Sequence, residues 1–282
     1  MDASLSRKMW RTLEPVHGMI YFAPEAATAY AAAGLDDARA GYFASRAAPM
    51  GAVPAEVVVA TFFNFNPALV GRAVPRCWSL ASPSVMLAAR LDAVDLALQR
   101  ILGAAVDGPE VAEAAELARV AATAPTMSVV GRPLYAGHAS LPWPDAPHLV
   151  LWHAISLLRE YRGDGHIAAL VGAGLGAVDA LVIHAGTGEV PRVALQSSRA
   201  WDDASWEAGV LRMQERGWIG PDGALTTSGR AHRNHVEDRT DALALAPWTH
   251  LGGEGCDRLR ALGRPLSQAV VAAGTFNVMP TT

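Results

Sequence analysis

The tripeptide Val74-Pro75-Arg76 recurs as Val190-Pro191-Arg192, and in both copies another arginine, Arg100 or Arg216, follows 24 positions after the first. Further matches keep the same order along the chain: Asp107-Gly108 with Asp222-Gly223, Ala124-Pro125 with Ala246-Pro247, and Gly131-Arg132-Pro133-Leu134 with Gly263-Arg264-Pro265-Leu266. Ordered self-similarity of this kind indicates a duplicated structural unit. We therefore expect two related halves with a groove between them, where one asymmetric ligand can bind because the halves no longer share side chains.

The segments between these matches have helical periodicity. Leu91, Val94, Leu98 and Leu102 form an apolar stripe at helical spacing, and the stretch from Trp206 to Met213 answers it in the second half. Both stretches end in glycine and lead to an Asp-Gly turn, as a hairpin wing would require. Each half is therefore predicted to contain helices followed by a short wing.

The second half resembles a MarR-type winged helix. In that resemblance 201–216 takes the place of the recognition helix, Gly217-Trp218-Ile219 begins the wing and Asp222-Gly223 is its turn. The whole chain resembles an actinobacterial family generally described as helix-turn-helix, most specifically at His17-Gly18, Phe63 to Pro67, Gly131 to Leu134 and Leu158 to His166. This resemblance implies a fold and an association with natural-product metabolism, and it implies no particular reaction.

The expected fold is mainly α, with two pseudo-repeated, degenerate winged-helix-like halves and short β wings. The N-terminal half is placed at 1–130 and the C-terminal half at 131–282, with an insertion at about 162–183 that breaks the symmetry. The buried helices of the halves are expected to pack closely, as two lobes or one compact unit, around a central pocket. MarR-type proteins dimerise, whereas a chain with two halves can internalise that interface, so a monomer or a homodimer is expected.

Composition limits the possible partners. The 282 residues carry a formal net charge of -4, which is unfavourable for general binding to nucleic acid. Cys77 and Cys256 are the only cysteines and are far apart, so neither a disulfide framework nor a cysteine-rich zinc site is indicated, and a reducing cytoplasm fits best. The N-terminus has no apolar secretion core, and no apolar run of membrane-spanning length is present without Gly, Pro or charge, so no membrane partner is expected.

The winged-helix segment lacks the chemistry of a DNA reader. Base and phosphate contacts need Arg, Lys, Asn, Gln or Ser on the recognition helix and cations in the wing. Here Asp202, Asp203 and Glu207 stand at the leading end of the helix, and the turn at 220–224 contains no cation. Arg230, His232, Arg233 and Arg239, which follow the wing, argue in the other direction. On balance no nucleic-acid partner is expected.

The densest polar cluster is Arg159 to His166. We interpret it as a site for a small anion, with Arg159 and Arg162 as the clamp, Asp164 as an orienting group or base, and His166 as the group that transfers a proton. A purely structural interpretation also fits, in which Gly163 ends one helix, Asp164 caps the next and the arginines interact with a helix C-terminus.

Other polar residues stand among apolar neighbours. His138 is a candidate catalytic group, and it matches Arg46 in the repeat, so the two should line equivalent positions of opposite halves. The further candidates for binding the substrate are Arg46, Asn64, Trp152, His17 and Tyr21. For Trp152 a place in the core is the simplest alternative, and Asn64 can equally satisfy a backbone group. His148 and His153 are five positions apart and lack the zinc-binding pattern on a helix, so no metal is expected.

These features lead to a prediction of function. No dinucleotide-binding, P-loop or nucleophile-elbow motif is present, so no cofactor is implied. We expect a cofactor-independent enzyme of specialised metabolism, of the lyase or cyclase type, that acts on a small anionic substrate by acid/base chemistry, elimination or intramolecular cyclisation. Two alternatives remain: a MarR-type regulator that responds to a ligand, and a non-catalytic protein that binds a small molecule for self-resistance.

Overall fold

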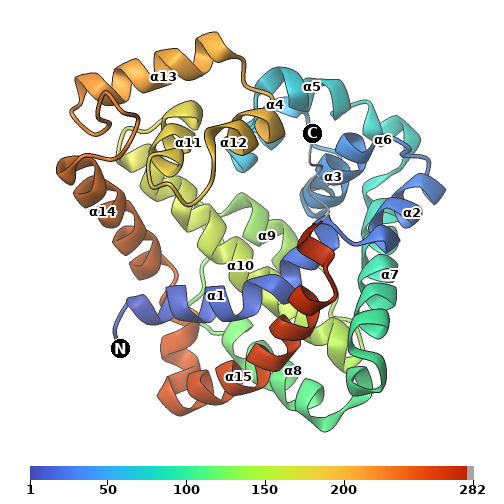
Figure 1. Cartoon of the computed structure of the whole chain (residues 1–282). Helices are drawn as coiled ribbons and strands as arrows, with labels where there is room; N and C mark the ends of the chain where they lie inside the picture. The colour runs from blue at the N-terminus through green and yellow to red at the C-terminus, as the bar shows by residue number, and fades with distance from the viewer. Residues whose placement is uncertain (278–282) are drawn as a thin grey trace.

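The computed structural model describes residues 1–277, and nearly all of its regular structure is helical (Figure 1). The first part of the chain forms α1 (Ser4–Gly18), α2 (Pro24–Ala32), α3 (Ala38–Ala47), α4 (Ala55–Phe62), α5 (Pro67–Ala73), α6 (Cys77–Leu80), α7 (Pro83–Leu102) and α8 (Pro109–Ala122). The second part forms α9 (Pro133–Ala139), α10 (Pro147–Gly172), α11 (Ala177–Ala185), α12 (Arg192–Arg199), α13 (Asp203–Glu215), α14 (Thr227–Leu243) and α15 (Ala246–Ala272). Short 3₁₀ helices lie at η1 (Met19–Tyr21), η2 (Ala48–Met50), η3 (Gly103–Asp107) and η4 (Thr275–Asn277).

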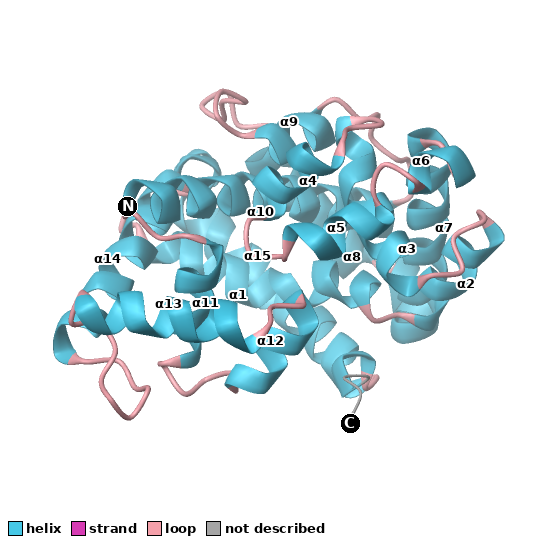
Figure 2. Ribbon diagram, turned by 90° about the horizontal axis from the view of Figure 1, so that it is seen from above, coloured by secondary structure: helices cyan, strands magenta, loops and turns pink. Residues whose placement is uncertain are grey.

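The prediction of a mainly α fold is confirmed, and the prediction of β wings is wrong. Between residues 1 and 277, β pairing is limited to one isolated antiparallel bridge, Ile219 with Leu225, and Figure 2 shows helices and loops only. Both bridge residues are buried in the core of the second part, whereas 221–224 are exposed and include a proline. Burial of the two ends and two backbone hydrogen bonds hold this loop closed: Gly220 N–H donates to the carbonyl of Ala224 at 2.8 Å, and Thr226 N–H donates to the carbonyl of Trp218 at 3.0 Å. At the equivalent place in the first part, the chain forms η3 and runs directly into α8.

Helix α9 packs against η2, the 3₁₀ turn that follows α3. The contact is very close, because a Cβ added at Gly137 would lie 2.7 Å from the carbonyl oxygen of Pro49. Only glycine permits this approach of α9 to η2. The approach sets where the side chains of α3 and α9 meet.

Helix α10 is continuous, which corrects the expected break at Gly163 and Asp164. It runs from Pro147 to Gly172, and most of its side chains are buried against α1, α8, α9 and α14. This packing on several sides outweighs the helix-weakening effect of Gly163 and Gly165. Gly165 has a specific use, since a Cβ there would come within 2.9 Å of Arg132 Nη1. The predicted insertion at 162–183 is therefore the last part of α10, a turn and most of α11.

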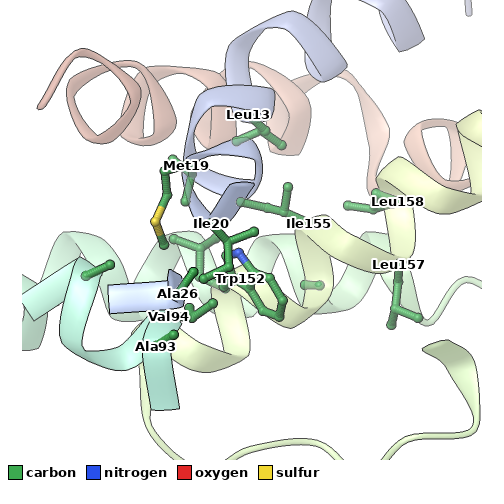
Figure 3. Packing of buried hydrophobic residues seen from close by; sticks show 14 of the residues in the cluster. Leu13, Met19, Ile20, Ala26, Ala93, Val94, Trp152, Ile155, Leu157 and Leu158 are labelled. Carbon is green, nitrogen blue, oxygen red and sulfur yellow. The ribbon is translucent and has the colours of Figure 1, made fainter. Parts of the chain in front are cut away.

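Two hydrophobic cores hold the described residues together. The larger core spans both sides of residue 130, and Figure 3 shows part of it, with Leu13 and Ile20 packed near Trp152 and Ile155 of α10. The smaller core joins α11 to α14 through Val182, Leu195, Trp206, Met213 and Val236. Full burial of each large apolar side chain contributes about 1.5–3 kcal/mol. The first 130 residues thus share a core with α10 and α15, and the helices that resemble a winged helix have their own.

No single helix within 1–277 has the length and apolar character that crossing a bilayer requires; α10 and α11 meet the criterion only as a pair, and their axes are bent by 98°.

The contact at Gly137 gives a test of the fold. Gly137→Ala should destabilise the protein by about 1–3 kcal/mol, because the added methyl group overlaps the backbone of Pro49 and Met50. Gly71→Ala is the control, since a Cβ at Gly71 in α5 meets nothing within 4 Å, and it should stabilise by about 0.5–1 kcal/mol through helix propensity. Urea unfolding measured by circular dichroism gives both values. Equal effects of the two substitutions would contradict the packing of α9 on η2.

Candidate functional site

A group of charged side chains lies where α1, α3, α7, α9 and α10 meet. We call it the central cluster, and its members are Arg46, Arg90, His138, Arg159 and Glu160, with His17 and Tyr21 beside them. Arg90, His138 and Glu160 are each only 3% exposed, and His17 is fully buried. The cluster therefore places three guanidinium groups and one carboxylate in a largely apolar interior.

The ring of Tyr21 is surrounded by the three arginines. The guanidinium carbons of Arg46 and Arg159 both lie 5.6 Å from the ring centroid, and that of Arg90 lies 5.9 Å from it. Arg90 also lies 5.0 Å from the ring of Trp152. Aromatic faces attract cations by about 0.5–2 kcal/mol. The rings thus hold the arginines in place without neutralising them.

Three buried N–H groups of the central cluster have no hydrogen-bond partner among the described residues: Arg46 Nε, Arg90 Nε and Arg90 Nη2. His138 Nε2 is also unpaired, and it donates or accepts according to the tautomer of the ring. The remaining contacts are few: Arg46 Nη1 donates to the hydroxyl of Tyr42 at 2.8 Å, and Arg90 Nη1 donates to the carbonyl of Ser45 at 3.0 Å. An unsatisfied buried donor costs about 1–3 kcal/mol, and more if it is charged. Donors left in this way are suited to an anion that brings its own acceptors.

The hydrogen bonds of His17 determine its tautomer. Ser156 Oγ donates to the carbonyl of Trp152 at 2.8 Å, so its only hydrogen is used and it must accept from His17 Nδ1 at 2.9 Å. His17 Nε2 then carries no hydrogen and accepts from the hydroxyl of Tyr21 at 2.9 Å. The ring is stacked on Trp152 at 5.4 Å between centroids. Tyr21 and His17 therefore form a pair through which a proton can pass.

Burial and charge shift the acid/base groups strongly. Burial, together with the positive charge of Arg90, lowers the pKa of His138 to about 3. Burial and the charges of Arg159 and Arg90 also lower the pKa of His17 well below its ordinary value. Burial alone would raise the pKa of Glu160, but Arg159 and Arg46 outweigh it and lower the pKa to about 2. At neutral pH both imidazoles are thus neutral bases and Glu160 is ionised.

The structure brings six of the predicted site residues together and leaves four outside. Arg46, His138, Arg159, His17, Tyr21 and Trp152 are in or against the central cluster. The residues outside it are Asn64, Arg162, Asp164 and His166. The cause is the unbroken course of α10, in which successive side chains point about 100° apart, so the residues from 159 to 166 face different neighbours.

The four outlying residues have structural contacts. Asp164 Oδ2 accepts from the backbone N–H of Tyr135 at 2.9 Å at the start of α9, and burial raises its pKa to about 6. Arg162 pairs with Asp241 at 3.1 Å, and His166 Nδ1 lies 2.9 Å from Thr240 Oγ1, both on α14. Asn64 contributes its backbone oxygen, which accepts from Trp201 Nε1 at 2.9 Å. None of these contacts adds a group to the central cluster.

Sequence reasoning missed Arg90 and gave Glu160 no role. A signal for Arg90 existed, because it lies on the same helical face as Met86, Val94 and Ala97, all fully buried. A lone arginine on an apolar stripe must be buried with that stripe. Glu160 had no such signal, since its burial follows from the neighbours of α10.

Within residues 1–277, neither of the two hollows described is the predicted central pocket. The two hollows found beside α1 have volumes of about 10 Å³ each, room for roughly one water molecule. One of them has Arg159 in its lining, and the other has apolar walls and His148. Among the described residues, no group of three or more His, Cys, Asp or Glu side chains is placed to hold a metal ion.

The arginines of the winged-helix segment are engaged in contacts within the protein. Arg192 pairs with Glu207 at 2.6 Å and with Asp203 at 3.2 Å. Arg212 pairs with Asp179 at 2.7 Å, and Arg216 Nη1 donates to the carbonyl of Gly174 at 3.0 Å. These bonds hold the cations of α12 and α13 to the protein itself. Arg230 and Arg239 of α14 are exposed.

The turn between α12 and α13 is bound to the first part of the chain. The backbone N–H of Asn66 donates to the carbonyl of Arg199 at 3.0 Å, and its side-chain amide donates to the carbonyl of Ala200 at 2.9 Å. Trp201 Nε1 completes the contact with Asn64, and Figure 1 shows α4 and α5 beside α12. A recognition helix usually reads bases with its N-terminal end. Here that end lies next to the loop at 63–66.

The shifted histidines make stability depend on pH. In the unfolded chain a histidine has a pKa of about 6.5, whereas His138 in the fold has a pKa of about 3, so the unfolded chain binds the extra proton between these values. Stability must then fall as pH decreases from 6.5, by up to ~1.4 kcal/mol per pH unit for each such group. Asp164, with its raised pKa, acts in the opposite direction between pH 6 and 4.

His138→Gln should therefore lessen the loss of unfolding free energy between pH 6.5 and 5 by nearly the amount that one buried neutral histidine contributes, up to ~1.4 kcal/mol per pH unit. Urea unfolding at several pH values measures the slope, and His235→Gln, at an exposed position of α14, is the control. An unchanged slope in His138→Gln would show that His138 is not buried as a neutral base.

Comparison with curated proteins and with solved structures gives no match to this chain. A protein-family model described as "Helix-turn-helix family" matches residues 6–277. The match extends far beyond α12 and α13 and takes in the helices that form the central cluster. Because it covers nearly the whole length, the chain belongs to this helix-turn-helix family.

Proposed function

We propose that this protein is a cofactor-independent enzyme that binds a small organic anion at the central cluster and acts on it by acid/base catalysis. The observation behind the proposal is a set of three buried guanidinium nitrogens on Arg46 and Arg90, together with Nε2 of His138, that have no hydrogen-bond partner among residues 1–277. They lie on α3, α7 and α9, and in the proposed complex the guanidinium nitrogens donate to the ligand while His138 Nε2 accepts a proton.

Charge supports an anionic ligand. Arg46, Arg90 and Arg159 are opposed within the cluster by one buried carboxylate, Glu160, and at its edge by Glu14. Buried charges are strongly unfavourable unless they are compensated. A ligand with one carboxylate or a similar oxyanion would offset the excess, and arginine binds such groups through two parallel hydrogen bonds.

Binding would also prepare a base. Part of the lowering of the His138 pKa comes from the charge of Arg90. An anion bound to Arg90 would offset that charge, so His138 would accept a proton more readily with the ligand in place. His17 and Tyr21 would supply a second proton-transfer route beside the same arginines. Proton abstraction next to a bound acid group, followed by loss or internal displacement of a leaving group, is the reaction type we propose, as a step in specialised metabolism.

A regulator is the second candidate, because the chain belongs to a helix-turn-helix family. Three observations argue against DNA reading: Asp203 and Glu207 of α13 are exposed, Arg192 and Arg212 are paired with carboxylates, and hydrogen bonds join the turn before α13 to the loop at 63–66.

A sequestering protein would bind the same anion without turnover. Tyr21→Phe separates that case from an enzyme, since it removes a proton-transfer group and leaves the arginines.

Arg90→Met should abolish anion binding and at the same time stabilise the ligand-free protein. The substitution removes a buried charge with two unpaired nitrogens and keeps an apolar side chain of similar length. Titration calorimetry with benzoate and sulfate would measure binding, and thermal unfolding would measure stability. Arg100→Met, at a partly exposed pair with Glu25, is the control and should leave benzoate binding unchanged. Wild-type binding that survives in Arg90→Met would place the site elsewhere.

Duplex DNA should bind weakly and without sequence preference. The charge pattern of α13 predicts little retention of a labelled random duplex, even in a buffer of low ionic strength where phosphate contacts are strongest. Fluorescence anisotropy across a salt series measures this. Tight binding with a steep salt dependence, lost on Arg230→Ala with Arg239→Ala, would favour the regulator instead.

A further inference from the structure

One of the hollows beside α1 shares Arg159 with the central cluster. It lies between α1, α10 and the first turn of α15, and its lining includes Trp10, Glu14, Arg159 and Trp248. Arg159 has a place in both regions. Its Nε faces Glu14, and its Nη1 donates to Glu160 of the central cluster at 2.7 Å. The Arg159 guanidinium group therefore belongs both to the lining of the hollow and to the central cluster.

The carboxylate of Glu14 accepts hydrogen bonds from the Nε side of Arg159, as the carboxylate of a ligand would. Its two oxygens lie 3.0 and 3.1 Å from Arg159 Nε, and its Oε2 also accepts from Trp10 Nε1 at 2.8 Å. The side chains of Glu14 and Arg159 remain 27% and 22% exposed. This carboxylate is thus the part of the arrangement that solvent and ligands can reach.

The backbone beside Glu14 is locally weakened. Pro15 lies inside α1, so the helix lacks the hydrogen bond that an N–H at this position would donate. An interior proline also favours a bend in the helix. Movement of Glu14 away from Arg159 therefore requires less disruption than at an ordinary helical position.

We propose that the hollow is the entrance to the central cluster and that Glu14 holds, on Arg159, the place of a ligand carboxylate. The inference rests on the function proposed above. A carboxylate ligand displaces Glu14 from Arg159 and passes between Trp10 and Trp248 to the donors of Arg90 and Arg46 and to His138. When Glu14 leaves, three guanidinium groups face Glu160 alone, so the attraction for the incoming anion is greatest at the moment of exchange.

The test uses the full chain, benzoate as the probe and Glu14→Gln as the variant. Glutamine keeps the size of the side chain and removes the competing charge, so benzoate should bind about tenfold more tightly than to the wild type. Glu25→Gln is the matched control, because Glu25 also pairs with an arginine, Arg100, away from the cluster. It should bind benzoate as the wild type does.

A second readout needs no substitution. The indole N–H of Trp10 donates to Glu14, so its resonance in a ¹⁵N-correlated NMR spectrum should move when benzoate is added to the wild type, and stay in place in Arg90→Met. Benzoate binding that depends on Arg90, with an unmoved Trp10 resonance and unchanged affinity in Glu14→Gln, would overturn the entrance and leave the proposed function standing. Absence of benzoate binding in every variant would overturn both.

Discussion

The placement of three guanidinium groups, one of them on the buried Arg90, around a single buried carboxylate is the constraint on which the central part of this structure depends. Guanidinium groups remain charged at any accessible pH, so the fold cannot lower the cost by releasing their protons. It holds them by other means: the aromatic faces of Tyr21 and Trp152, the hydroxyl of Tyr42, and a carboxylate from α10. These contacts orient the arginines but leave part of their hydrogen-bonding capacity unused. In the function proposed above, an anionic ligand uses this capacity.

Helix α10 makes this arrangement possible because it carries Arg159 and Glu160 at neighbouring positions and passes through the centre of the molecule (Figure 1). Two glycines allow close approaches around this helix. The absence of a side chain at Gly165 leaves room for Arg132, and the absence of one at Gly137 lets α9 lie directly against η2. The second of these contacts lies one residue before His138 in α9. The packing around the cluster therefore depends on these two glycines as well as on the charged side chains.

The sequence carried part of this information. The repeat aligned His138 with Arg46, and both lie in the central cluster. The grouping at 159–166 was less informative. Proximity along the chain suggested one site, but in a continuous helix Arg162 and His166 face α14 while Arg159 and Glu160 face the centre. Whether Gly163 and Asp164 end a helix depends on tertiary packing, and local propensity could not decide it.

The predicted wings are a second case in which a local sequence pattern did not decide the structure. Two Asp-Gly turns predicted hairpins, yet only the second turn closes, through one bridge between the buried Ile219 and Leu225. A hairpin needs paired strands with an apolar face on a core, and the flanking residues here are taken up by helices. The segment from α11 to α14 keeps a core of its own, while Arg192 pairs with Asp203 and Glu207 and Arg212 pairs with Asp179. Asn66 binds the turn before α13 to the first part of the chain. The function we propose assigns the chemistry to the central cluster and not to this segment, because a fold alone does not determine a function.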